Sequence, residues 1–233
     1  MTDRLTTIGF DADDTLWHNE RFFRMTQDRF AELLADHSDR EHLAERLLAA
    51  ERRNIGQYGF GIKGFMLSMI ETAIEVTEGR VPGEVIGRIL ADGREMLSHP
   101  IDLLPHAEAA VRRAAERHRV VLITKGDLLD QERKLAQSGL GDLFASVEIV
   151  SEKTAARYAE IFARTADGAS RAMMVGNSLK SDVLPALEAG GWGVHVPHDL
   201  TWALEHAEEP ADHPRFRSLS SLESLSSLIE EIG

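Results

Sequence analysis

Three carboxylates lie within four consecutive positions near the start of the chain. Asp11, Asp13 and Asp14 come directly after a short apolar run that ends at Phe10. Ionised side chains this close repel one another unless a cation or a proton relieves the charge. A cluster of this kind at the end of a strand therefore predicts a metal site.

Four further polar residues end or follow later apolar, β-branched runs: Thr124, Lys153, Asn177 and Asp182. The carboxyl ends of parallel strands meet at one edge of a sheet, so we expect these residues to join Asp11 and Asp13 there. The combined set holds a carboxylate nucleophile, a second carboxylic acid, a hydroxyl, an ammonium and an acidic cation site. Phosphoryl transfer to an aspartate requires these groups.

The spacing of Asp11 and Asp13 allows one carboxylate to face the electrophile while the other faces the leaving group. We expect Asp11 to attack phosphorus and to form an aspartyl-phosphate. Asp13 would protonate the departing alkoxide and then deprotonate the water that hydrolyses the intermediate. Lys153 would neutralise charge on Asp11 and the phosphoryl oxygens, and Thr124 would hydrogen-bond those oxygens.

A divalent cation is expected because an anionic nucleophile cannot approach an anionic phosphate unscreened, and magnesium suits an all-oxygen site. The expected ligands are Asp11, Asp182 and the backbone carbonyl of Asp13. Asp14 is expected to be a turn residue, because aspartate tolerates a left-handed backbone.

Three residues are candidates for contact with the substrate: His18, Lys63 and Lys125. His18 stands just beyond the aspartate cluster, where a hinge or packing role explains its position equally well. Lys63 lies in a stretch rich in glycine and aromatic residues, Tyr58–Phe65, which we expect to be a loop. A solvent-exposed lysine explains Lys63 as well as a substrate contact does. The remaining histidines are scattered and predict no metal cluster.

The elements that must position these residues follow from the hydrophobic pattern. Alternating strands and helices in the later part of the chain predict an α/β fold with a parallel sheet covered on both faces. Between Glu20 and about Leu97, apolar residues recur at helical spacing in four stripes, which predicts an all-helical insert. We expect residues 1–17 and 100–233 to form the core domain and residues 18–99 to form an inserted domain of four helices.

Composition and charge limit the classes of partner. The chain has 233 residues, 43% of them hydrophobic, which is enough for a sizeable core. Its formal net charge of −13 repels phosphate backbones and anionic lipid, so we expect no nucleic-acid or membrane partner. Cysteine is absent, and no signal peptide or membrane-spanning run stands out, so we expect a cytoplasmic protein. A monomer and a homodimer fit the sequence equally.

The ordered polar segments resemble the four motifs of the haloacid dehalogenase-like (HAD) hydrolase superfamily. They are Asp11-Ala12-Asp13-Asp14-Thr15, Thr124, Lys153 and the stretch from Gly176-Asn177-Ser178 to Asp182, and they span nearly the whole chain. The resemblance implies a Rossmannoid core and a helical cap that closes over the site. The second aspartate, Asp13, is similar to that of the phosphatases and phosphomutases, whereas the true dehalogenases lack an acid there. The sequence departs from the family pattern at Asn177, where aspartate is frequent, and at Asp14, where glycine is frequent. The resemblance therefore makes Asn177 a provisional metal ligand that binds the ion directly, binds it through water or only orients its loop.

We therefore expect a magnesium-dependent phosphohydrolase that acts on a small phosphorylated metabolite through an aspartyl-phosphate. A phosphomutase of the same superfamily is the first alternative, because cap residues and water exclusion decide where the phosphoryl group goes. A non-catalytic phosphate-binding or regulatory module is the second alternative. The presence of both Asp11 and Asp13 argues against such a module.

Overall fold

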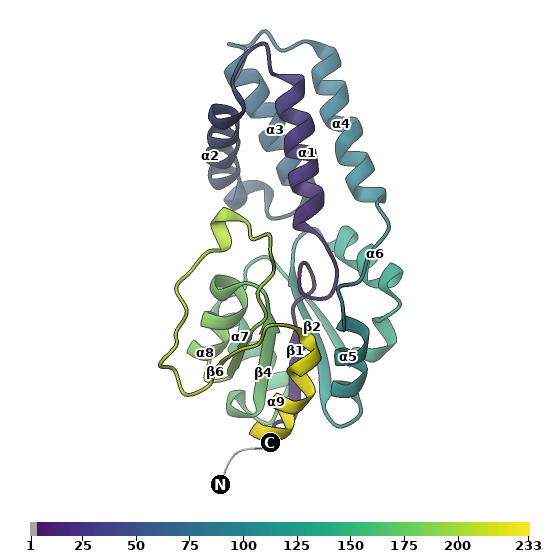
Figure 1. Ribbon diagram of the computed structural model, residues 1–233, viewed down its shortest axis with the longest axis vertical. Coiled ribbons are helices and arrows are strands. Elements are labelled where there is room, and N and C mark those ends of the chain that lie inside the picture. Colours follow the sequence, from purple (N-terminus) through teal and green to yellow (C-terminus); the bar gives the residue numbers. More distant parts are fainter. Residues whose placement is uncertain (1–3) are drawn as a thin grey trace. The chain divides into compact units, whose positions relative to one another are not determined.

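The strands of the protein form one parallel sheet. The computed structural model describes residues 4–233, and within them six strands pair in the order β3-β2-β1-β4-β5-β6, every pair parallel (Figure 1). The strands are β1 (Thr7–Phe10), β2 (Arg119–Lys125), β3 (Ser146–Val150), β4 (Ala172–Gly176), β5 (Trp192–His195) and β6 (Phe216–Ser218). The strand order reverses between β1 and β4, and parallel sheets bind ligands at the carboxyl ends of strands beside such a switch point.

Helices cover both faces of the sheet. They are α5 (Ala107–Ala115), α6 (Leu128–Ser138), α7 (Ala155–Thr165), α8 (Leu184–Glu188) and α9 (Leu225–Ile232). Helices α5 and α9 share a hydrophobic cluster with Ile8 and Phe10 of β1, whereas α7 and α8 share another with Val121 and Ile123 of β2. Alternate strand residues point to opposite faces, so both faces are buried. The expected α/β fold with a covered parallel sheet is confirmed.

Four helices occupy most of the chain between β1 and β2: α1 (Glu20–Leu33), α2 (Arg40–Tyr58), α3 (Ile62–Val76) and α4 (Gly83–Ser98). Their apolar stripes meet in one buried cluster that includes Phe30, Leu47 and Met69. This confirms the expected helical insertion. No helix within residues 4–233 has the length and apolar character needed to cross a lipid bilayer.

The loop expected over Tyr58–Phe65 is shorter than predicted. Helix α2 ends at Tyr58 and α3 begins at Ile62, which leaves residues 59–61 between them. Gly59 and Gly61 adopt positive φ angles of 73° and 110°, which a residue with a side chain rarely takes, so the chain turns tightly. Lys63 therefore lies in the first turn of α3 and not in a loop.

The chain divides into two compact units. The sheet unit comprises the described residues up to Glu20, Ile101–Lys125 and Gln131–Gly233, and the helical unit comprises Arg21–Pro100 and Gly126–Asp130. We expected the chain to pass from one domain to the other at 17/18 and 99/100, whereas along the sequence it passes between the two units at 20/21 and 100/101. Residues 126–130, expected in the core domain, belong to the helical unit. Residues 1–3 lie outside the described part of the chain.

Candidate active site

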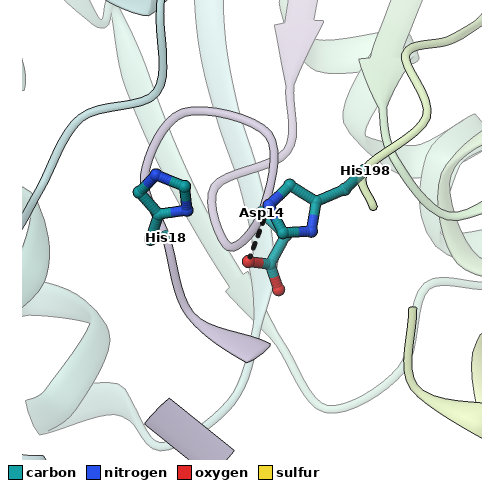
Figure 2. A group of neighbouring side chains, drawn as sticks. All are labelled: Asp14, His18 and His198. Carbon is teal, nitrogen blue, oxygen red and sulfur yellow. Dashed lines mark ion pairs between the residues drawn. The ribbon is translucent and has the colours of Figure 1, made fainter. Parts of the chain in front are cut away.

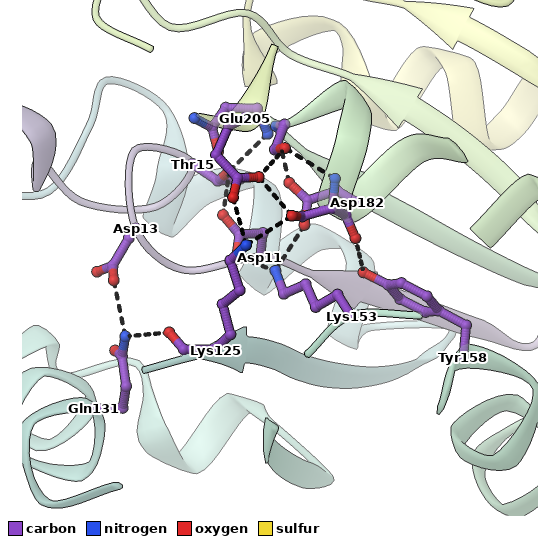
Figure 3. A network of polar contacts seen from close by, with 12 residues as sticks. Asp11, Asp13, Thr15, Lys125, Gln131, Lys153, Tyr158, Asp182 and Glu205 are labelled. Atoms are coloured by element: carbon purple, nitrogen blue, oxygen red, sulfur yellow. Dashed lines mark hydrogen bonds and ion pairs between the residues drawn. The ribbon is translucent and has the colours of Figure 1, made fainter. Parts of the chain in front are cut away.

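Asp11 lies directly after β1, at the switch point of the sheet. Its backbone N–H donates to the Val175 carbonyl (2.9 Å), which continues the pairing of β1 with β4. Oδ2 of Asp11 accepts from the Thr15 hydroxyl (3.0 Å), and Oδ1 accepts from the Lys153 ammonium (Figure 3). The Asp11 carboxylate is thus held by its own turn on one side and by a lysine that follows β3 on the other.

Lys153 joins two buried carboxylates. Its Nζ also donates to Oδ1 of Asp182 (2.6 Å), and the side chains of Lys153, Asp11 and Asp182 are at most 8% exposed. Burial and the charge of Asp182 raise the pKa of Asp11 to about 7, although Lys153 opposes this shift. Burial disfavours a charged Lys153, yet the two carboxylates keep the pKa of Lys153 well above its usual value. Because one ammonium faces two carboxylates, a further positive charge would be favourable here.

The side-chain amide of Asn177 completes an oxygen-rich corner beside Asp11. One terminal atom of the amide lies 3.2 Å from Oδ2 of Asp11, from the carbonyl oxygen of Asp13 and from the Thr15 hydroxyl. If this atom is the amide nitrogen, it donates to these oxygens. If it is the amide oxygen, the Asn177, Asp11 and Asp13 oxygens face one another with no proton between them.

This corner fits a magnesium ion. Oxygen ligands about 2.1 Å from Mg²⁺ stand about 3 Å apart in an octahedron, close to the separations around the Asn177 amide. The chemistry of the donor set agrees, because these ligand atoms are all oxygens. The residues that could hold the ion are Asp11, Asp182, Asn177 and, through its carbonyl, Asp13.

Asp182 reaches the site because Gly176 has no side chain. Asp182 stands on a π-helical turn, Leu179–Val183, and its Oδ2 accepts from the backbone N–H of Ser178 (2.9 Å). A β-carbon at Gly176 would lie 2.2 Å from Oδ2 of Asp182, which is far inside contact distance. The glycine at the end of β4 therefore permits the close approach of the carboxylate.

The carboxylate of Asp13 is directed toward α6, as Figure 3 shows for its contact with Gln131. It accepts from the Trp17 indole N–H (2.7 Å), the Gln131 amide (2.8 Å) and the Lys134 ammonium (3.0 Å). Burial disfavours its charged form, but Lys134 and these hydrogen bonds hold the pKa of Asp13 below its usual value. Sequence reasoning missed all three partners. The spacing of Gln131 and Lys134, three residues apart on one helix face, is the signal that could have found two of them.

A carboxylate from a later loop neutralises Lys125. Glu205, which ends the short 3-10 turn Ala203–Glu205 between β5 and β6, accepts from Nζ of Lys125 (2.5 Å). It also accepts from the hydroxyls of Ser178 (2.6 Å) and Ser181 (2.5 Å). Burial opposes a charged Glu205, but Lys125 and the hydroxyls keep the pKa of Glu205 below its usual value. The ammonium of Lys125, expected to contact substrate, is thus engaged by protein groups.

Two other expected site residues lie in different units. Thr124 is buried one residue before the end of β2, and β2 pairs with β1. It therefore shares the edge of the sheet with Asp11. Lys63 is exposed on α3 in the helical unit, where its ammonium lies 2.9 Å from Asp127 and lowers the pKa of that carboxyl.

Asp14 shapes the turn after β1. Its φ of 60° is left-handed, as the interpretation of Asp14 as a turn residue predicts. Its carboxylate accepts from the backbone N–H groups of Asn19 (2.8 Å) and Glu20 (2.9 Å) and so caps α1. Burial raises the pKa of Asp14 to about 6. His18 and His198 lie beside Asp14, so His198 is not scattered as the sequence suggested (Figure 2).

The fold and the site define a class of α/β hydrolases that carry paired aspartates after the central strand of a parallel sheet. The sequence profile of the haloacid dehalogenase-like hydrolases matches residues 5–190. The chain belongs to this family of hydrolases. Its helical insertion between β1 and β2 stands where the family carries its cap.

Solved structures support the assignment. A haloacid dehalogenase-like family hydrolase from Xanthomonas campestris is 42% identical, with a TM-score of 0.88 over 98% of this chain and 91% of that one. A putative family hydrolase from Bacillus subtilis bound to magnesium is 16% identical (TM-score 0.66; 97% and 99% covered). L-2-haloacid dehalogenase from Xanthobacter autotrophicus, with chloropropionic acid covalently bound, is 18% identical (TM-score 0.69; 98% and 100% covered). The latter two show a shared fold. No curated protein matches the chain.

Proposed function

We propose that the protein is a magnesium-dependent phosphohydrolase that acts on a small phosphorylated metabolite. The observation that carries the proposal is the second carboxylate, Asp13, which follows Asp11 by two residues and is held by three donors. A phosphate ester releases an alkoxide, which needs a proton, so a carboxyl group next to the nucleophile has a chemical task. Halide leaves carbon without a proton, so a dehalogenase needs no acid for its leaving group.

The oxygen atoms around Asn177 support a magnesium requirement. Asp11, Asp182, the Asp13 carbonyl and the Asn177 amide oxygen would hold the ion. When bound, Mg²⁺ screens the charge between the nucleophilic carboxylate and an incoming phosphate. The raised pKa of Asp11, about 7, agrees with a site in which added positive charge is needed to keep Asp11 ionised.

The proposed reaction has two half-reactions. In the first, a carboxylate oxygen of Asp11 attacks phosphorus, the ester P–O bond breaks, and Asp13 gives a proton to the leaving alkoxide. In the second, Asp13 takes a proton from water, and the water oxygen attacks phosphorus, which frees phosphate and restores the Asp11 carboxylate. Throughout, Lys153 stays beside Asp11 and offsets negative charge on the phosphoryl oxygens, and Thr124 donates to one of them.

The lowered pKa of Asp13 sets a condition on the first half-reaction. Asp13 is ionised while Lys134 and Gln131 hold it, so it must gain a proton before it can act as an acid. A phosphate monoester has a second pKa of about 6, so its monoanion carries a proton. We propose that this proton passes through Asp13 to the alkoxide as the P–O bond breaks, which makes the monoanion the productive form of the substrate.

One screen tests the proposal. Purified protein is incubated with sugar phosphates, nucleoside monophosphates, phospho-acids and 2-haloacids, and the release of phosphate and of halide is measured with Mg²⁺ or with EDTA. We expect phosphate to be released in the presence of Mg²⁺ and not in EDTA. The Asp11→Asn variant should release none, and the Asp13→Asn variant should release phosphate about 10²–10⁴ times more slowly than the parent protein. Asp167→Asn, the same change at an aspartate that is 73% exposed, should leave the rate unchanged.

Other outcomes of this screen identify the rivals. Transfer of phosphate between positions of one sugar, without release, would show a phosphomutase. Saturable binding of phosphate esters without turnover would show a binding or regulatory module. Halide release that survives EDTA would overturn the proposal in favour of a dehalogenase.

A further inference from the structure

We propose that Asp14, His18 and His198 form a second cation site, which takes a transition metal of the Zn²⁺ type and is separate from the oxygen corner at Asp11. Each residue offers one ligand atom, and the three atoms lie within 4.8 Å of one another (Figure 2). All three residues belong to the sheet unit. Asp14 and His18 come from the turn after β1, whereas His198 comes from the chain after β5.

The distances are close to those of a tetrahedral site. Nε2 of His198 lies 3.7 Å from Oδ1 of Asp14, and the two imidazole rings are 5.8 Å apart at an interplanar angle of 66°. Zinc bonds of about 2.0–2.1 Å place neighbouring tetrahedral ligands about 3.4 Å apart. Small side-chain rotations would bring the three ligand atoms to that spacing, and water would supply a fourth ligand.

The surroundings orient two of the three ligands. Nδ1 of His198 lies 2.9 Å from the carbonyl oxygen of Leu200 and 3.2 Å from its backbone nitrogen, so Nδ1 has a partner whether or not it carries a proton. With the proton on Nδ1, the lone pair of Nε2 is directed toward Asp14 and is available to a cation. Metal-bound histidines are commonly held in this way by the other ring nitrogen. The Asp14 carboxylate is fixed by the backbone N–H groups of Asn19 and Glu20. Oδ1 accepts from both (2.8 and 3.1 Å) and Oδ2 accepts from Glu20 (2.9 Å), which leaves a lone pair on Oδ2 for a cation.

The types of ligand atom and the burial of the three side chains determine which metal ions fit the site. Two imidazole nitrogens and one carboxylate suit Zn²⁺, Co²⁺ or Ni²⁺, whereas Mg²⁺ prefers oxygen ligands and gives up its water reluctantly. The side chains of His198 and Asp14 are 11% and 8% exposed, so the carboxylate is largely shielded from water. A cation bound there would coordinate the Asp14 carboxylate and so compensate for the water that this carboxylate loses on burial.

Metal binding can be measured without any activity. Untagged protein, stripped of metal, is titrated with Zn²⁺ by calorimetry and with Co²⁺ by visible absorption, with Mg²⁺ in excess to fill the oxygen corner. We expect one equivalent of Zn²⁺ and a Co²⁺ spectrum of low coordination number. His198→Gln and His18→Gln should each weaken the affinity at least tenfold.

Matched variants separate this site from other sources of binding. His37→Gln changes an exposed histidine of the helical unit and should leave the titration unchanged. Asp11→Asn should keep Zn²⁺ binding even though it abolishes the proposed phosphatase activity, so failure of one proposal does not imply failure of the other. Circular dichroism confirms that each variant is folded.

Three results would overturn the inference. They are the absence of saturable Zn²⁺ binding, unchanged binding in both His18→Gln and His198→Gln, and binding lost in Asp11→Asn but kept in His198→Gln. The last would place the metal at the oxygen corner. In each case His198 and Asp14 would form an ion pair only.

Discussion

Replacement of Asp11 by asparagine should stabilise the metal-free protein above neutral pH while it removes activity. Asp11 and Asp182 are two buried carboxylates that share one ammonium, that of Lys153. Asparagine at position 11 leaves one carboxylate for one ammonium. Local charge balance improves, although the nucleophile is lost.

The magnitude follows from the pKa of the Asp11 carboxyl, which folding raises from 3.8 to about 7. Below pH 3.8 the folded and unfolded chains are both protonated, so the group has no effect on stability. As the pH rises toward 7, the unfolded chain ionises first and stability is lost, up to about 4 kcal/mol at about 1.4 kcal/mol per pH unit. Asparagine imitates the protonated carboxyl and avoids this cost, and the attraction between Asp11 and Lys153 is already contained in the pKa of about 7. We expect a gain of about 4 kcal/mol at pH 8 and about 1.5 kcal/mol at pH 5.

Urea unfolding in EDTA, followed by tryptophan fluorescence at pH 5 and pH 8, measures this gain. The three tryptophans, Trp17, Trp192 and Trp202, all lie in the sheet unit, so the signal reports the unit that contains Asp11. Asp167→Asn controls for loss of an exposed carboxylate and should change stability by less than about 0.5 kcal/mol at both pH values. An Asp11→Asn variant that is less stable than the parent at pH 8, or whose gain is equal at the two pH values, would refute the reasoning.

Three other changes give distinct outcomes. Gly176→Ala should displace Asp182, because the new β-carbon would lie 2.2 Å from its Oδ2, and calorimetry should show Mg²⁺ affinity at least about tenfold weaker; unchanged affinity would contradict the ligand role. Glu205→Gln leaves Lys125, whose side chain is 15% exposed at the end of β2, without its carboxylate and should cost about 3 kcal/mol in urea unfolding, whereas a neutral effect would show that the pair adds no stability. Lys134→Met removes the main charge that lowers the pKa of Asp13, so the acidic limb of the pH–rate profile should move to higher pH; an unmoved limb would exclude Asp13 as its source.

The contacts of Asp11, Lys153 and Asp182 could be anticipated from the sequence because each follows a strand of one parallel sheet. A parallel sheet brings the carboxyl ends of its strands to one edge, so the end of each apolar run indicates where its polar residue will lie. The roles assigned to these residues stay predictions. The hydrogen bonds of Lys153 to both carboxylates are what the structure adds.

Glu205 could not be anticipated for a physical reason. It comes from the irregular chain between β5 and β6, which has no hydrophobic period to relate one residue to the next. The place of such a residue depends on the path of the whole loop rather than on its neighbours in sequence. His198 comes from the same loop and escaped notice for the same reason, whereas Asp14 and His18 lie in a motif that could be recognised.

The pKa values of Asp11 and Asp13 are shifted in opposite directions, although only Ala12 separates the two residues. Burial and Asp182 move the pKa of Asp11 up to about 7, whereas Lys134 and its neighbouring donors move that of Asp13 down. Two carboxyls in one site can take different roles when their environments separate their pKa values.

In the free protein, however, Asp11 tends to hold a proton and Asp13 tends to lack one, the reverse of what the proposed first half-reaction needs. When a monoanionic ester binds together with a divalent cation, the cation supplies the positive charge that keeps Asp11 ionised. The ester supplies the proton that Asp13 lacks. On this reasoning kcat/KM should fall as the pH rises above the second pKa of the ester, about 6.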